Sequence, residues 1–313
     1  MYMTTPRLFI FGLGFSGQAT ARLALSLGWR VSGAVRTEEK AAVLAAQLPG
    51  LKVMSLERPD AASQLRVQIS QATHLLASAP TVPADLEAPE GPHLDPLLAL
   101  LGEHGAPEHL VWTGYLSTTV VYGDWQGAWV DEDSETRSTS VRGLRRLEAE
   151  AAWSVATPTA HIFRLAGIYG PGRNALETVR RGKARIIDKP GQVFSRTHVE
   201  DIAQILVASM LSPSAPQANQ PAAIYNVCDD YPCPPGEVIE HACALLGVSA
   251  PTAVPFDQAQ MTPMARSFYG DNKRVRNDRA KALLASQGWA LKYPSYREAL
   301  DVELQRLDSI EGH

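Results

Sequence analysis

The stretch that decides the fold is R-L-F-I-F-G-L-G-F-S-G, residues 7–17. Residues 8–11 form a short apolar run typical of a buried strand, and glycines follow at positions 12, 14 and 17 in G-x-G-x-x-G spacing. Residues 18–27 then have the apolar pattern of a helix, which ends at Gly28. A strand, a glycine turn and a helix in this order predict the first half of a dinucleotide-binding unit.

Each glycine of this turn has a separate steric task. Gly12 allows the tight turn, Gly14 lets a pyrophosphate approach the backbone, and Gly17 lets the helix pack close to the strand. Phe15 and Ser16 lie between them, where free N–H groups at the helix N-terminus face the phosphates. We expect all five residues to bind the cofactor; the alternative is a plain tight turn without a ligand.

Composition limits the class of protein. The chain has 313 residues, of which 45% are hydrophobic and 20% charged, which suits one large α/β domain or a domain with an added lobe. A net charge of −4 without a basic tract argues against nucleic acid or an anionic membrane surface as a partner. No apolar run approaches the ~20 residues of a membrane span. Since the chain runs directly into a strand, we expect no signal peptide.

The three cysteines, Cys228, Cys233 and Cys243, have no metal-ligand spacing, and we expect no metal site. Their odd number argues against a disulfide framework, and this cysteine usage fits a reducing cytoplasm. We thus expect a cytoplasmic protein. Since nucleic acid and membrane are not expected as partners, the predicted partner is a small-molecule substrate.

Short apolar runs alternate with helical patterns along the first two thirds of the chain. Strands are expected over residues 30–35, 52–56, 73–79, 109–115, 160–168 and 223–228, and helices over 37–48, 61–70, 141–155 and 200–210. This alternation predicts a doubly wound parallel sheet of the Rossmann type. Ligands of such sheets lie beyond the carboxyl ends of the strands, where Arg36, Ser78, Ala79 and the 116–119 turn are found.

The predicted domain division follows the same pattern. Residues 1–164 form the dinucleotide-binding core, and residues 195–230 return to it. Residues 165–194 and 231–313 form a smaller lobe on the substrate side, since the later part is richer in proline and turns. Residues 80–92 hold four prolines and are expected to form a loop at the rim of the site, and residues 131–140 a polar loop.

Arg36 directly follows the second strand. In many NAD-binding proteins an acidic residue at this strand end holds the ribose hydroxyls, but here no carboxylate occurs before Glu38. A guanidinium suits a 2′-phosphate, so NADP is the predicted cofactor and NAD the second choice. The alternative is a solvated arginine at a helix start.

Five blocks resemble one family, the extended short-chain dehydrogenases/reductases of the NAD-dependent epimerase/dehydratase type. They are L-S-T-T-V-V-Y-G-D (116–124), F-R-L-A-G-I-Y-G-P-G (163–172), R-T-H-V-E-D-I-A (196–203), I-Y-N-V (224–227) and G-W-A-L-K-Y-P-S-Y-R-E-A-L (288–300). The blocks occur in the family's order over nearly the whole chain. The resemblance implies a nicotinamide cofactor and a sugar or nucleotide-sugar substrate.

The sequence departs from the family in two places. The glycine spacing is G-x-G-x-x-G rather than G-x-x-G-x-x-G, and the catalytic Tyr-x-x-x-Lys is absent. Alignment of residues 147–150 with the family's helix puts Arg142 at the tyrosine position and Arg146 at the lysine position. The chain thus looks like an atypical member, similar to the YeeZ-like subgroup. Arg142, Arg146 and Glu150 are spaced by four, so the alternative is an exposed ladder of ion pairs.

The resemblance assigns roles to the residues that remain. Thr118, with Ser117 beside it, matches the family's substrate-orienting Ser/Thr, and Arg146 is expected to bind the nicotinamide ribose. Arg142 cannot act as an acid, because a guanidinium keeps its proton, but it can stabilise an oxyanion. Candidate proton donors in the motif loops are Tyr115, Tyr122, Tyr169 and His198, of which His198 has the most suitable unperturbed pKa. Each of them has an alternative as a packing or capping residue.

Basic residues of the expected lobe suggest an anionic substrate. They are Lys183, Arg185, Arg196, Arg266, Lys273 and Arg274, and Arg196 and Arg266 are the pair expected to bind it. Two functions stay open at this point. One is an NADP(H)-dependent oxidoreductase or epimerase-like enzyme with an altered acid; the other is a catalytically silent NADP(H)-binding sensor or regulatory module.

Overall fold

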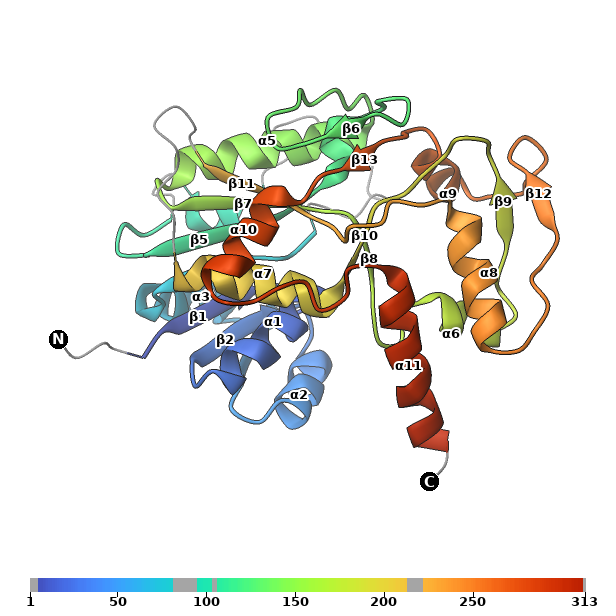
Figure 1. Cartoon of the computed structure of the whole chain (residues 1–313). Coiled ribbons are helices and arrows are strands. Elements are labelled where there is room, and N and C mark those ends of the chain that lie inside the picture. The colour runs from blue at the N-terminus through green and yellow to red at the C-terminus, as the bar shows by residue number, and fades with distance from the viewer. Residues whose placement is uncertain (1–4, 81–94, 103–105, 213–221, 312–313) are drawn as a thin grey trace.

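The computed structural model describes residues 5–80, 95–102, 106–212 and 222–311. Its centre is a seven-stranded parallel sheet with the order β11-β7-β5-β4-β1-β2-β3 (Figure 1). The strands are β1 (Arg7–Phe11), β2 (Arg30–Val35), β3 (Lys52–Ser55), β4 (His74–Ala77), β5 (Trp112–Thr118), β7 (Ala160–Leu165) and β11 (Ala223–Val227). The predicted Rossmann-type α/β fold is confirmed. The strand order reverses at β1, so the glycine turn lies where such sheets bind ligands.

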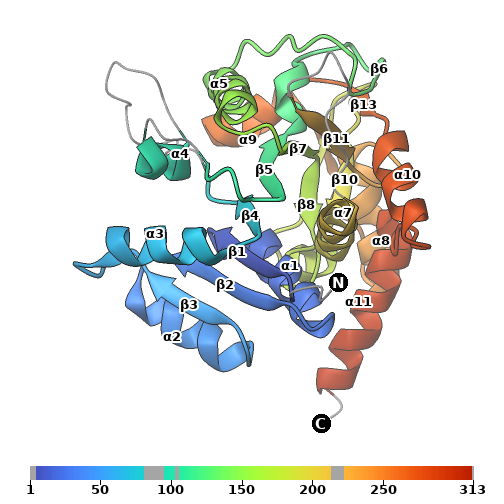
Figure 2. The same ribbon diagram turned by 90° about the vertical axis from the view of Figure 1, so that its left-hand side faces the viewer.

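Helices cover both faces of the sheet (Figure 2). Leu8 and Ile10 of β1 belong to a core with α1 (Phe15–Ser26), α2 (Glu38–Gln47), α7 (Val199–Leu211) and α10 (Asp278–Ser286). Phe9 and Phe11 belong to a second core with α3 (Ala61–Gln71), α4 (Pro96–Leu101) and α5 (Val141–Ala156). Side chains of a strand alternate between its faces, so a strand covered on both sides reads as a continuous apolar run.

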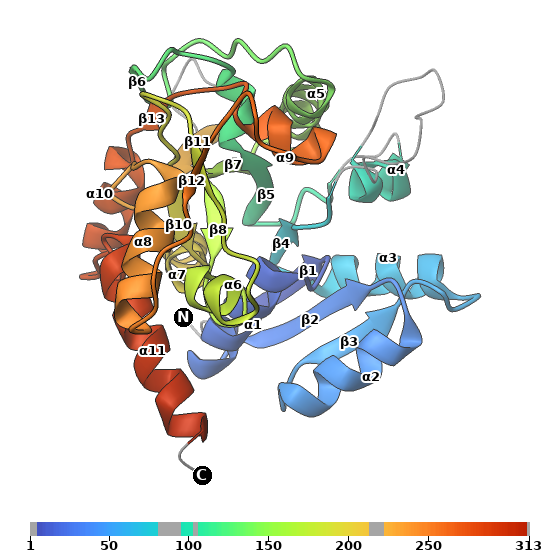
Figure 3. The same cartoon turned by 90° about the vertical axis from the view of Figure 1, so that its right-hand side faces the viewer.

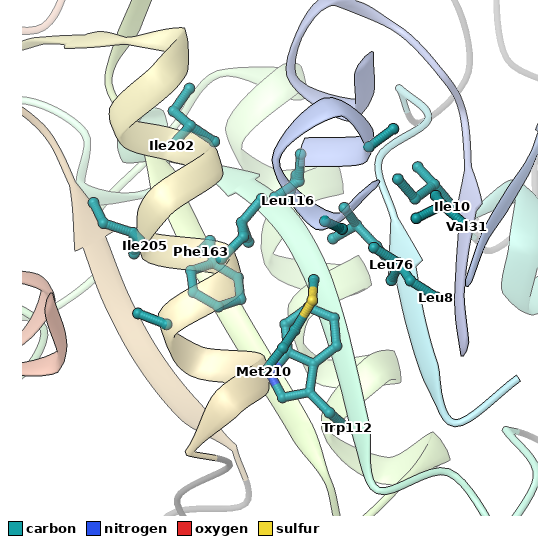
Figure 4. Close-up of a cluster of buried hydrophobic side chains, with 14 of the residues drawn as sticks. Leu8, Ile10, Val31, Leu76, Trp112, Leu116, Phe163, Ile202, Ile205 and Met210 are labelled. Carbon is teal, nitrogen blue, oxygen red and sulfur yellow. The ribbon is translucent and has the colours of Figure 1, made fainter. Parts of the chain in front are cut away.

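The core under α7 shows how the sheet is held. Figure 4 shows side chains from the strands facing those of α7, among them Leu76, Trp112, Phe163, Ile205 and Met210. The indole Nε1 of Trp112 donates to Ser209 Oγ at 2.9 Å, which satisfies a buried donor inside this apolar layer. α1 and α7 also pack against each other. The glycine turn therefore starts from a rigid support.

The sixth predicted strand is broken, which corrects the sequence analysis. Residues 160–168 were expected to form one strand, but β7 ends at Leu165 and Ala166 donates its N–H to Val227 O. The chain then enters β8 (Gly167–Tyr169), which pairs in parallel with β10 (Arg196–His198) outside the main sheet. An apolar run does not reveal where a strand changes partner, because both parts are buried.

A second region lies beside the sheet (Figures 1 and 3). It holds two small parallel pairs, β9 (Ile186–Asp188) with β12 (Ala253–Pro255) and β6 (Trp129–Val130) with β13 (Arg274–Val275). Its helices are α6 (Ala175–Arg180), α8 (Pro235–Leu245), α9 (Pro263–Phe268) and α11 (Tyr296–Glu311), and a 3₁₀ turn, η2 (Thr119–Tyr122), follows β5. The buried side chains of α6, α8 and α11 form a separate apolar cluster.

Other expectations are met or changed locally. Thr37, where the 37–48 helix was expected to begin, is the N-cap of α2, since its Oγ1 accepts the N–H of Lys40 at 3.2 Å. α4 was not predicted; it begins at Asp95, whose carboxylate accepts the N–H groups of Leu97 and Leu98. α10 was assigned to the lobe but packs on α7 and β11. Most of the expected 80–92 rim loop lies outside the described residues.

Three chemical features concern the described residues alone. None of the helices there is long and apolar enough to cross a bilayer. No group of three or more His, Cys, Asp or Glu side chains in those ranges is arranged to hold a metal ion. All three cysteines are free and buried.

Candidate functional site

The glycine turn between β1 and α1 is shaped as the sequence analysis expects. Gly12 has φ +98°, and a Cβ there would lie 2.6 Å from the backbone N of Ala79. A Cβ at Gly17 would lie 2.7 Å from Gly12 O. At Gly14 a Cβ would have no neighbouring atom within 4 Å, so this residue faces open space. Phe15 and Ser16 form the first turn of α1. The turn thus exposes backbone where a pyrophosphate can approach.

The end of β4 forms the second side of this turn. Ser78 donates its N–H to Phe11 O at 2.9 Å, and Ala79 lies directly against Gly12. Ser78 and Ala79 are both half-buried. The structure therefore brings these two residues and the glycine turn together at the carboxyl edge of the sheet.

Arg36 lies exposed at the end of β2, and its backbone oxygen accepts a hydrogen bond from Ser55 Oγ at 3.1 Å. Two residues beside it, Glu57 and Arg58, are not indicated by any sequence motif. Glu57 Oε2 accepts the N–H of Glu38 at 3.2 Å, and Arg58 lies 3.8 Å from the Glu38 carboxylate. Both come from the loop after β3, which pairs with β2. The strand end therefore carries a carboxylate as well as guanidinium groups.

Ser117 and Thr118 end β5 but face different surroundings. Ser117 Oγ donates to Glu150 Oε1 at 2.5 Å in the interior. Thr118 Oγ1 accepts the N–H of Val120 at 3.3 Å and caps the 3₁₀ turn η2. Since the Ser117 hydroxyl is bound to a buried carboxylate, Thr118 is the better placed of the two to reach a substrate.

A buried polar network lies behind these two residues. The Glu150 carboxylate pairs with the Arg164 guanidinium at 2.8 Å, and each side chain is 6% exposed. Arg164 Nη1 donates to Tyr122 Oη at 3.0 Å, and Tyr122 Oη donates to Asn226 Oδ1 at 2.7 Å. This network links α5, β7, η2 and β11. Two bonded members, Tyr122 and Asn226, are 104 positions apart in the sequence, so no local pattern of residues indicates this network.

Tyr122 is therefore poorly suited to act as an acid. Its hydroxyl proton is bound to Asn226, its side chain is fully buried, and burial raises its pKa to about 12. Tyr115 is similar: burial raises its pKa to about 12, and its hydroxyl accepts a hydrogen bond from Arg146. Burial likewise raises the pKa of Tyr169, whose hydroxyl donates to Ser295 O at 3.4 Å.

Arg146 points inward, against β5. Its Nη1 donates to Tyr115 Oη and to Leu116 O, both at 2.9 Å. Arg142, one turn earlier, is exposed and lies over the Phe268 ring of α9 at 5.4 Å. Glu150 pairs with Arg164 rather than with either arginine. The alternative of an exposed ion-pair ladder on this helix is therefore wrong.

His198 has the surroundings of a capping residue. Its Nδ1 accepts the N–H of Glu200 at 3.2 Å at the start of α7, and its ring packs 4.0 Å from that of Tyr293. The side chain is fully buried, and burial lowers its pKa to about 4. A buried imidazole that is neutral near neutral pH lacks the imidazolium proton that a general acid gives, so these surroundings argue against His198 as the acid.

Arg196 and Arg266 do not form one basic cleft. Arg196 Nη1 donates to Phe194 O at 2.9 Å and to Cys233 Sγ at 3.1 Å, and Arg196 lines a cavity of about 430 Å³. Arg266 lies outside the lining of that cavity; it donates to Ala259 O and covers the Phe256 ring at 4.7 Å. Isolated basic residues carry no signal of which ones will share a cavity.

The other basic residues of the lobe are also separated. Lys183 lines the same cavity as Arg196. Arg185 donates to Gln260 O at 3.2 Å, Lys273 to Gly123 O at 2.7 Å, and Arg274 to Gly127 O. The last three hold backbone segments together, which is a structural role.

Comparison with known proteins gives relatives along most of the chain. No family model matches. Protein YeeZ of Escherichia coli is 25% identical over 224 residues, 71% of this chain and 77% of its own length. A solved structure of a Silicibacter pomeroyi protein of unknown function is 43% identical, with TM-score 0.81 over 97% of this chain and 100% of that one. One from Methylobacillus flagellatus, provisionally named an NAD-dependent epimerase/dehydratase, is 26% identical, with TM-score 0.67 over 97% and 99%.

More distant solved structures share the fold. The UDP-glucuronic acid 4-epimerase of Bacillus cereus, in complex with NAD, is 17% identical with TM-score 0.69 over 98% of both chains. Human epimerase family protein SDR39U1, with NADPH, is 18% identical with TM-score 0.69 over 96% and 99%. The topology of the sheet, the shape of the glycine turn and these comparisons agree: the chain is similar to YeeZ and to the Methylobacillus flagellatus protein, and it has the Rossmann-type fold of the epimerase structures.

Proposed function

We propose that this protein binds NADP(H), with NAD(H) as the second choice, and acts as an oxidoreductase or epimerase-like enzyme on an anionic sugar or nucleotide-sugar. The observation that carries the proposal is the contrast within the glycine turn. Side chains at Gly12 and Gly17 would strike backbone atoms, whereas the space beside Gly14 is open. A turn closed toward the protein and open on its outer side fits a bound pyrophosphate.

The choice between the two cofactors rests on Arg36. Among the fold neighbours, one structure holds NAD and another NADPH. The exposed guanidinium of Arg36 is free to turn toward a 2′-phosphate, and Arg58 adds a second positive charge nearby. Glu57 acts in the opposite direction, although its carboxylate accepts the N–H of Glu38 at the start of α2.

The catalytic part of the proposal rests on β5 and α5. A bound nicotinamide supplies or accepts the hydride. Arg146 would hold the nicotinamide ribose with the N–H groups that Tyr115 and Leu116 leave free, since a guanidinium has five donors. Thr118 would orient the substrate oxygen, and the fixed charges of Arg142 and Arg146 would stabilise negative charge on it.

The alternative, a silent NADP(H)-binding sensor, stays a second candidate because of one specific observation. Among the four candidate acids named from the sequence, Tyr115, Tyr122 and Tyr169 are buried with raised pKa values, and His198 is buried and neutral. An enzyme of this design would need its proton from another source, whereas a sensor needs none.

One experiment separates the two functions. NADPH and NADH are titrated into the protein by fluorescence. The protein with oxidised cofactor is then offered a panel of UDP-sugars in D₂O. Reduced cofactor is followed by absorbance, and the sugars are separated by chromatography before mass spectrometry, because epimers have the same mass. Binding with conversion of any sugar supports the enzyme. Binding without conversion or isotope exchange favours the sensor, and failure to bind either dinucleotide contradicts both.

A further inference from the structure

A cavity of about 430 Å³ opens between α6, α8 and α11. The three helices lie together in both Figure 1 and Figure 3, and each contacts the other two. Its lining comes from these helices, from β10 and from the turn after β8, and includes no residue of the glycine turn, β4, β5 or α5. The cavity is therefore not part of the dinucleotide site described above but adjoins it, since Arg173 of the lining lies over the Phe15 ring at 5.9 Å.

The floor of this cavity is apolar and its rim is basic. Tyr296, Leu300 and Val238 are buried beneath it. Arg173, Arg181 and Lys183 are exposed around it, and Arg196 is half-buried in the wall. A cavity with an aromatic floor and cations at its edge suits a ligand with an apolar body and an anionic group.

The charges of the lining are unbalanced. Four cationic side chains line the cavity, and Glu177 is the single carboxylate among the described lining residues. Glu177 is already paired with Arg181 at 3.0 Å. Outside the lining, Glu237 is bound to Arg297 at 2.6 Å and to Tyr296 Oη at 2.9 Å. The rim is thus left with a positive charge excess that an anion would balance.

Arg196 lies in the wall close to one buried carboxyl group. That group belongs to Asp229, which follows β11 and whose backbone N–H donates to Arg196 O at 2.7 Å. Burial raises the pKa of the Asp229 carboxyl group to about 8. A carboxyl group whose pKa is raised carries less negative charge beside the guanidinium than an exposed one would. Arg196 Nη1 is held by Phe194 O and Cys233, which fixes the group in position beside the cavity.

We propose that this cavity is a second binding site of the protein, for a small organic phosphate whose apolar or aromatic part lies on Tyr296 and Leu300 while its phosphate group contacts Lys183, Arg181 and Arg196. The volume of about 430 Å³ is that of a site for a small molecule rather than for a protein surface. The cavity and the dinucleotide site are adjacent but have no lining residue in common, so the proposal does not rest on the proposed function.

Calorimetric titration with phenyl phosphate tests the proposal, with the protein saturated with NADPH and again without it. We expect binding in both cases, with affinity that falls as salt is added. Lys183→Gln should weaken binding about tenfold, as expected for loss of a charge-assisted contact. Arg185→Gln is the matched control: it removes the same charge two positions away, outside the cavity, and should change the affinity by less than about twofold.

A second variant tests the apolar floor. Leu300→Asn should also weaken binding of phenyl phosphate but leave binding of inorganic phosphate unchanged, and its thermal unfolding is measured to verify that it folds. Ile239→Asn, at a half-buried apolar position of the same lining, serves in its place if it does not. Displacement of phenyl phosphate by NADPH, equal affinity in the Lys183 and Arg185 variants, or no binding at all would overturn the proposal. Because NADPH binding is measured separately, failure of the dinucleotide site does not affect this result.

Discussion

The glycine turn between β1 and α1 and the face formed by β5 and α5 are built in different ways. The turn consists of six consecutive residues, and its shape follows from the absence of side chains at Gly12, Gly14 and Gly17. The β5–α5 face depends on Glu150, Arg164, Tyr122 and Asn226, which come from four separate elements. A local turn can be recognised from its letters, whereas a buried network depends on partners that meet only in the folded chain.

This difference predicts different responses to mutation. In the turn, a substitution should affect either binding or folding, depending on which side of the backbone the new side chain occupies. In the network, a substitution should destabilise the whole domain, because it leaves a buried charge without its partner. The predictions below run from the largest expected effect to the smallest.

Glu150→Gln should give the largest loss of stability. It leaves the Arg164 guanidinium buried and unpaired, which costs about 3–5 kcal/mol of the unfolding free energy. Urea denaturation measures this change. Glu148→Gln is the control, because Glu148 is exposed on the same helix and should cost less than about 0.5 kcal/mol. Equal effects of the two variants would mean that the network does not stabilise the fold.

Gly12→Ala and Gly14→Val separate folding from binding within one turn. Gly12→Ala combines a positive φ with a contact of 2.6 Å to Ala79 N, and should lower the unfolding free energy by about 2 kcal/mol or more. Gly14→Val should leave stability within about 1 kcal/mol and weaken dinucleotide binding by about tenfold or more. Fluorescence titration and denaturation are compared for both; unchanged dinucleotide affinity in Gly14→Val would contradict the assigned site.

Arg36→Ala should separate the two cofactors. Loss of a charge-assisted contact to the 2′-phosphate should cost about 1.5–3 kcal/mol, so NADPH binds about tenfold or more weaker while NADH is nearly unaffected. Glu57→Gln is the matched variant that removes a negative charge at the same strand end, and it should increase the affinity for NADPH. Equal affinity of the unmutated protein for NADPH and NADH would refute the role of Arg36.

Arg146→Ala should weaken cofactor binding by about 1–2 kcal/mol, because the guanidinium would no longer reach the nicotinamide ribose. Arg142→Ala, one turn away and exposed, should leave cofactor binding unchanged and lower only turnover of an anionic substrate. The two variants are titrated with the same dinucleotide. A larger loss of cofactor affinity in Arg142→Ala would reverse the two assignments.

The His198 side chain should be uncharged in the folded protein near neutral pH. Burial lowers its pKa to about 4, below the usual value near 6.5, so the folded state keeps the ring neutral. The folded state therefore gains stability from this group above about pH 6.5, and that gain is lost as the pH falls toward about 4. Titration of the ring by NMR measures the pKa. A value near 6.5 would restore His198 as a candidate acid.

The sequence by itself determined the parts of this protein that depend on neighbouring residues. The period of apolar residues gave most strands and helices, Thr37 marked the start of α2, and the three glycines marked the turn. These features follow from backbone sterics and from burial of one strand at a time, so they can be read from short windows. The end of β7 at Leu165 was missed, because a change of strand partner leaves no mark in an apolar run.

The tertiary structure alone decided which residues meet. It turned Arg146 toward β5, joined Ser117 to Glu150, and placed Glu57 beside the end of β2. It also enclosed Tyr122 and His198, whose pKa values move in opposite directions because burial disfavours the charged form of each group. Burial and long-range partners depend on the packing of segments far apart in the chain, and no local pattern of residues specifies them.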